Sequence, residues 1–394
     1  MDLIGNADYY TLFPAYFNYA AFEKGLISFA GSNYVNVVYA CAILAGLTAA
    51  GVFLIVYRMG SGMRIAVLAG IMCALVPSNI FYTITGSPDF MSVAFNTYGL
   101  LMLLIVIDSK DNWVKQLIVG GCAGMLLGVG ASYKQFAVII LIAFVISYIA
   151  SLIHKGETGN SRQGQTKDKW RKETLTAALI FAVIITGYKV SGEMILSHTE
   201  GVYGLSLDSG TATPHFFLVG LNAQGEGQIH LGNLSRQYTE RYLNNGYDQE
   251  EAKEYAYVLL KQDWKENRAI IPNLFVKKVV WAWQDDVIPS QYLKSGNCKY
   301  TETEIGTFAG IAQASYMLIL ILALIGTAYY IRGKDINYKC EMIMLVIFGY
   351  FCLLLLSEAQ SRYKCLIMPY LCILGAYGVS NLCEIIINRR RRHE

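Results

Sequence analysis

The stretch Ser357-Glu-Ala-Gln-Ser-Arg-Tyr-Lys-Cys-Leu-Ile-Met-Pro369 places three charged side chains between two long apolar runs near the C-terminus. The charged residues are Glu358, Arg362 and Lys364. Ionisable groups at the edge of a membrane are costly, and they are usually kept where they pair with one another or bind something polar. The stretch therefore predicts a polar site at one membrane face, and the topology decides which face.

The composition indicates an integral membrane protein whose partner is the lipid bilayer. Of 394 residues, 54% are hydrophobic and 15% are charged, against roughly 25% charged in soluble proteins. A net charge of +3, with the basic residues spread over short loops, excludes a nucleic-acid partner. Eight of the nine cysteines fall in or beside apolar runs, and no pair has zinc-ligand spacing. We predict no disulfide framework, no protein-bound metal and no cofactor, and leave a divalent cation open.

Apolar runs long enough to cross a bilayer set the fold class. A crossing helix needs about 20 apolar residues, and about nine runs qualify. We predict an all-α polytopic membrane protein with an extracytoplasmic insertion of about 110 residues. The runs cover 34–57, 64–85, 90–107, 114–131, 136–153, 174–193, 307–331, 340–356 and 363–387.

The runs divide the chain into five parts. Two membrane bundles, of six and three helices, are separated by the polar insertion, and a flexible cytoplasmic linker lies inside the first bundle. The parts are an extracytoplasmic interfacial segment 1–33, the first bundle 34–193 with its linker 154–173, the insertion 194–306, the second bundle 307–388 and a basic cytoplasmic tail 389–394.

Lysine and arginine in short loops give the orientation, because they accumulate on the cytoplasmic side. With the C-terminus cytoplasmic, most loop cations lie inside, and the stretch 357–362 faces outside in a multi-pass plasma membrane protein. An odd number of crossings also puts residues 1–33 outside. Since no signal peptide is visible, we expect a transmembrane helix to be missing before Met1; the alternative is a true N-out protein.

The outer loops collect ionisable residues that form the candidate site. Snorkelling at a helix end is the alternative for each of them alone, and their gathering on one face favours a site. Asp89 alone is better explained as a cap for a helix starting at Phe90, and His215 as a hydrogen-bonded packing residue. The outer residues are Asp2, Asp8, Asp89, Lys134, Glu358, Arg362 and Lys364.

Several short motifs resemble the multi-pass glycosyltransferases of the GT-C superfamily, near the protein-mannosyltransferase and aminoarabinose-transferase types of glycosyltransferase family 39. Similar proteins carry an aromatic-Pro segment, an acidic outer loop and a lysine opening an apolar helix. The matching residues are Phe13-Pro14, Asp89, Lys134, Pro214-His-Phe-Phe-Leu-Val-Gly-Leu-Asn222 and Glu358-Ala-Gln-Ser-Arg-Tyr363.

The resemblance implies transfer of one sugar from a polyprenyl-phosphate donor to an acceptor hydroxyl, on a glycan, lipid or protein, at the outer face. It assigns the catalytic carboxylate to Asp89 or Asp8. It assigns the donor phosphate to Lys134, Arg362 and Lys364. His215, Asn222, Glu358 and Tyr363 are the implied substrate-binding residues.

The chain also departs from the resembling family. There the principal acidic residue follows the first transmembrane helix, and this chain starts beyond that helix. If nothing lies upstream, we expect the chain to be inactive or nearly so. Two other functions stay open: a transporter or flippase of lipid-linked saccharides, which needs a polar path through the helices, and a non-catalytic accessory subunit if the N-terminus is native.

Overall fold

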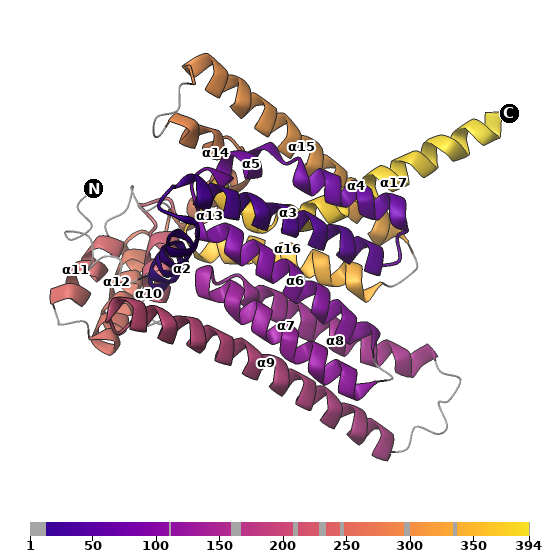
Figure 1. The fold of residues 1–394 in the computed structure, drawn as a ribbon, viewed down its shortest axis with the longest axis horizontal. Coiled ribbons are helices and arrows are strands. Elements are labelled where there is room, and N and C mark those ends of the chain that lie inside the picture. Colours follow the sequence, from indigo (N-terminus) through magenta and orange to yellow (C-terminus); the bar gives the residue numbers. More distant parts are fainter. Residues whose placement is uncertain are drawn as a thin grey trace.

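A computed structural model describes residues 13–109, 112–158, 167–207, 212–227, 234–244, 248–294, 300–333 and 337–393, and these ranges contain helices and no strand (Figure 1). The elements are α2 (Pro14–Ala30), α3 (Val35–Arg58), α4 (Met63–Ala74), α5 (Pro77–Thr83), α6 (Pro88–Asp108), α7 (Trp113–Tyr133), α8 (Ala137–Thr158), α9 (Lys167–Tyr203), α10 (Ala212–Leu221), α11 (Leu234–Asn244), α12 (Gln249–Glu266), α13 (Ile271–Trp283), α14 (Ile288–Gln291), η2 (Tyr292–Lys294), α15 (Glu302–Arg332), α16 (Tyr338–Leu356), η3 (Ser361–Leu366) and α17 (Met368–His393).

By length and composition, seven of the described helices can cross a membrane, or eight if the bent pair α4–α5 is one span. The all-α multi-pass class is confirmed, and the count falls below the nine predicted runs. The run 64–85 bends by 49°, because Pro77 begins a new helix and holds Val76 in an extended conformation. The run 136–153 forms a helix whose apolar part, Ala137–Ile153, is short.

Glycines allow the long helices to approach closely. On α7, Gly124 and Gly128 face the backbone of α9, where an added Cβ atom would overlap the carbonyl oxygens of Ile184 and Tyr188. On α17, Gly378 meets the Leu322 carbonyl of α15 in the same way. Small residues at such contacts increase van der Waals packing between membrane helices, where no hydrophobic driving force operates.

The two ends of the bundle differ. The insertion helices α10 to α14 gather with α2 at one end, and the C-terminal part of α17 extends from the other (Figure 1). Asp108 forms ion pairs with Arg58 at 2.8 Å and with Lys339 at 2.9 Å, and these residues lie at the ends of α6, α3 and α16, away from the insertion. The insertion therefore covers one end of the helix bundle.

Aromatic side chains tie the insertion to the N-terminal segment. Phe13, which precedes α2, packs in one buried cluster with Leu218 of α10 and with Tyr238 and Tyr242 of α11. Trp264 of α12 donates a hydrogen bond to the Leu221 carbonyl at 2.8 Å. The end of α10 and the turn after it are thus held in place above the membrane helices.

Candidate functional site

Asp89 lies buried at the start of α6, with 4% of its surface exposed. Its Oδ2 accepts hydrogen bonds from the Tyr82 hydroxyl at 2.6 Å and from the Ser87 hydroxyl at 3.0 Å. The capping interpretation of Asp89 is wrong. The helix begins at Pro88, and Ser87 caps it by accepting from the Asp89 amide, so the Asp89 carboxylate is free for other contacts.

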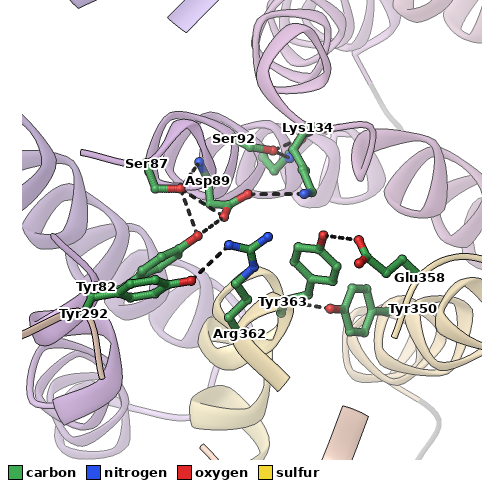
Figure 2. Close-up of polar contacts among 11 residues, drawn as sticks. Tyr82, Ser87, Asp89, Ser92, Lys134, Tyr292, Tyr350, Glu358, Arg362 and Tyr363 are labelled. Carbon is green, nitrogen blue, oxygen red and sulfur yellow. Dashed lines mark hydrogen bonds and ion pairs between the residues drawn. The ribbon is translucent and has the colours of Figure 1, made fainter. Parts of the chain in front are cut away.

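Lys134 faces Asp89 from the break between α7 and α8. Its Nζ lies 3.7 Å from Asp89 Oδ1 and 4.1 Å from the centre of the Tyr363 ring (Figure 2). The ammonium therefore has one anionic and one aromatic neighbour. Burial lowers the pKa of Lys134, but the Asp89 carboxylate and Tyr363 raise it further than burial lowers it. Lys134 stays protonated.

The short helix η3 supplies the other side of the cluster. Tyr363 donates from its hydroxyl to Glu358 Oε2 at 2.7 Å, and Tyr350 donates to the Tyr363 carbonyl at 2.6 Å. Burial raises the pKa of Tyr363, so its hydroxyl keeps the proton that it donates. Glu358 and Tyr350 thus fix the ring beside which both Lys134 and Arg362 lie.

Arg362 extends from η3 toward Asp89 and Lys134 (Figure 2). Its guanidinium donates to the Tyr292 hydroxyl at 3.0 Å and lies 5.3 Å from the Tyr363 ring centre. The Tyr292 ring stacks on Tyr82, with centroids 5.8 Å apart. Within the described part of the chain the buried Arg362 Nε has no hydrogen-bond partner. A partly buried guanidinium with a buried, unfilled donor is suited to an anionic ligand.

These residues form an arrangement that we call the Asp89 cluster: Asp89, Lys134, Arg362 and Tyr363. In it, the Lys134 and Arg362 cations lie beside the Tyr363 ring. Of the two Asp89 carboxylate oxygens, Oδ2 accepts hydrogen bonds. Asp89 Oδ1 accepts no hydrogen bond among the described residues. The cluster can bind a phosphate through the cations and accept a proton at Asp89 Oδ1.

An apolar cavity of about 210 Å³, partly open at the surface of the bundle, reaches Asp89. Small residues of α3, including Ala42, Ala45 and Gly46, form one wall, and residues around the α4–α5 bend form another. Cys365 of η3 and Phe90 of α6 lie beside Asp89 at its polar end. An apolar space between α3 and the α4–α5 bend therefore meets the Asp89 cluster.

Lys364 does not point into the Asp89 cluster, although the family resemblance implied that it binds the donor phosphate. Its side chain is 0% exposed. Its ammonium contacts the Ala282 and Asp285 carbonyls and lies 3.9 Å from Asp286 Oδ1. An ammonium so enclosed has no open side for a substrate.

His215 and Asn222 lie in the insertion. The His215 ring is buried edge-on against Phe13, with centroids 5.0 Å apart. Asn222 accepts hydrogen bonds at Oδ1 from the Gln224 and Gly225 amides and so shapes the turn after α10. Through these contacts His215 packs the insertion against the N-terminal segment, and Asn222 stabilises the turn after α10.

The sequence analysis missed three members of the site: Ser87, Tyr82 and Tyr292. They orient the charged groups, and only Ser87, as a residue before a helix-starting proline, carried a signal. Two residues that it did name, Asp2 and Asp8, fall outside the described ranges. Among the described residues, no group of three or more His, Cys, Asp or Glu side chains is placed to hold a metal ion.

Residues 4–189 match the model of the family described as dolichyl-phosphate-mannose-protein mannosyltransferase. This range contains Asp89 and Lys134 and ends before η3. No curated protein sequence matches the chain. A solved structure of the archaeal oligosaccharyltransferase AglB from Archaeoglobus fulgidus, in complex with an inhibitory peptide and a dolichol-phosphate, is similar with a TM-score of 0.48 and 15% identity. The match covers 95% of this chain and 43% of that one.

The burial of His215 gives a pH prediction. Burial lowers the pKa of His215 from 6.5 to about 4, so between these values the unfolded state binds a proton that the folded state excludes. This contribution to stability is complete above pH 6.5 and is lost as the pH falls toward 4. We expect His215→Gln to reduce the acid-induced loss of melting temperature over this range, measured on detergent-solubilised protein. Equal slopes in both proteins would contradict the assignment.

Proposed function

We propose that the chain transfers mannose from a dolichyl-phosphate carrier to an acceptor hydroxyl, because residues 4–189 match the model of the dolichyl-phosphate-mannose-protein mannosyltransferase family. The observation that supports this most is the pair of cations in the Asp89 cluster. Arg362 keeps an unfilled buried donor, and the Lys134 ammonium lies beyond hydrogen-bond distance of Asp89. The Arg362 guanidinium and the Lys134 ammonium can therefore both bind an anion at one end of the apolar bundle.

In this proposal Lys134 and Arg362 bind the phosphate that links mannose to the lipid. During transfer the bond between the anomeric carbon and the phosphate oxygen breaks, and the phosphate keeps the electron pair. Two fixed cations stabilise this developing negative charge without any reorganisation, because Tyr363 and Tyr292 already hold them. The apolar cavity would receive an uncharged part of a substrate, since no basic residue lines it.

Asp89 is the proposed general base. The acceptor oxygen attacks the anomeric carbon while its proton passes to Asp89 Oδ1. Tyr82 and Ser87 occupy Oδ2, so the carboxylate presents a defined oxygen to the acceptor. The acceptor is a hydroxyl of a glycan, lipid or protein.

For the topology we propose nine crossings, in which α4–α5 and α8 each count as one. The Arg58, Asp108 and Lys339 end then faces the cytoplasm with the C-terminus. The Asp89 cluster and the insertion face outside, in the plasma membrane. This places the site where a lipid-linked donor meets an external acceptor.

Removing either cation tests the phosphate site. We expect Arg362→Ala and Lys134→Ala each to lower mannose transfer from dolichyl phosphate mannose about tenfold or more, a barrier increase of ~1.4 kcal/mol. Turnover is measured in proteoliposomes with radiolabelled donor and an envelope extract as acceptor. Lys24→Ala is the control, because Lys24 is an exposed cation of α2 that contacts Tyr203. Unchanged turnover in both test variants would remove the phosphate assignment.

Asp89→Asn tests the base. The amide keeps the shape of the carboxylate but accepts no proton, so we expect the transfer rate to fall about a hundredfold or more while the Michaelis constant for the donor changes little. Expression and melting temperature serve as the folding control. A variant that loses only expression, with its turnover per folded molecule intact, would show that Asp89 acts in structure alone.

A further inference from the structure

We propose that two buried lysines, Lys278 and Lys364, are positioning residues that fix the segment between Leu355 and Lys364 against α13 and thereby place Arg362 and Tyr363 in the site. We call this segment, 355–364, the site segment. The inference rests on the proposed function for its consequence, donor binding. It rests on the contacts of the two lysines for its geometry.

Lys278 holds the N-terminal end of the site segment. It belongs to α13, is 1% exposed, and donates from Nζ to the Leu355 and Gly220 carbonyls, each at 2.6 Å. Leu355 lies in the last turn of α16 and Gly220 in the last turn of α10. A cation there complements the negative ends of both helix dipoles and satisfies carbonyls that have no helical partner.

Lys364 holds the C-terminal end of the site segment. Here the lysine belongs to the site segment and the carbonyls belong to the end of α13. Lys364 belongs to η3, is 0% exposed, and donates to the carbonyls of Ala282, at 3.1 Å, and Asp285, at the end of α13. Two residues of α15 complete this helix end. Tyr316 donates to the Trp283 carbonyl at 2.7 Å and Gln313 to the Gln284 carbonyl at 3.1 Å.

The two lysines therefore connect the same two elements twice. Lys278 of α13 donates to the start of the site segment, at Leu355. Lys364, at the end of the site segment, donates back to α13, at Ala282. Between them, the Ala359 amide donates to the Gly227 carbonyl at 3.1 Å. Gly227 lies against the Lys278 stem, where an added Cβ atom would come within 2.8 Å of Lys278 Cγ. Arg362 therefore lies between two anchored positions of the chain, Leu355 and Lys364.

The cost of burying these ammonium groups supports a positioning role. Burial lowers the pKa of Lys278 to about 7 and that of Lys364 to about 8, and it raises the pKa of Asp286, beside Lys364, to about 6. Apolar residues would fill the same space at a lower desolvation cost. Ammonium groups add directed hydrogen bonds, which fix the backbone of the site segment.

Substitution of each lysine by methionine, in the full chain, tests the proposal. We expect Lys278→Met and Lys364→Met to weaken binding of dolichyl phosphate at least tenfold and to speed hydrogen exchange in residues 357–363. Lys277→Met is the matched control, because Lys277 is the neighbouring residue and pairs with Glu226 in a half-exposed ion pair. Its affinity and exchange should stay at the wild-type level. Lys278→Arg, which keeps a cationic donor, should recover part of the affinity.

The outcomes separate positioning from general stability. Lower melting temperatures with wild-type affinity and exchange in the folded protein would overturn the proposal. If wild-type protein does not bind dolichyl phosphate, the proposed function fails, and exchange in residues 357–363 still decides the positioning role. If the methionine variants do not accumulate, Asp286→Asn removes the carboxylate beside Lys364, and Gly227→Ala, at a left-handed backbone position, crowds the Lys278 stem. Affinity within twofold of wild type in both would then overturn it.

Discussion

The ion pair between Lys134 and Asp89 is the contact on which the site depends. Asp89 is buried and Lys134 is half-buried, so a lone charge at either position would be unfavourable, and each is stabilised by polar or aromatic neighbours from other elements. The pair brings the break between α7 and α8 to the start of α6. Because the atoms are 3.7 Å apart, both keep capacity for a further ligand. The short helix η3 brings Arg362 next to this ion pair.

Hydrogen bonds join α13 of the insertion and the membrane helices α15 and α16 around η3. Helix α13 exchanges lysine contacts with the site segment, and α15 satisfies the end of α13 through Tyr316 and Gln313. Residues outside the family match thus complete a site whose first half lies within it.

Hydrophobic runs predicted an all-α bundle, one-sided charges pointed to Asp89, Lys134 and Arg362, and the family resemblance added Tyr363. The structure brings these four residues together. The bend at Pro77 and the short apolar part of α8 lowered the span count, since run length alone does not report a change of direction. The enclosure of Lys364 was not predictable. An isolated lysine in sequence does not show whether helix-end carbonyls or a substrate will meet it, because these carbonyls come from α13, some 80 residues earlier.

The most direct test of the account is a structure of the full chain in lipid nanodiscs with dolichyl phosphate bound, determined by electron cryomicroscopy. The account predicts the phosphate between the Lys134 ammonium and the Arg362 guanidinium, within hydrogen-bond distance of both, with Asp89 Oδ1 open on the side that an acceptor approaches. A phosphate bound at the Arg58, Asp108 and Lys339 end, or on the insertion away from Arg362, would contradict it.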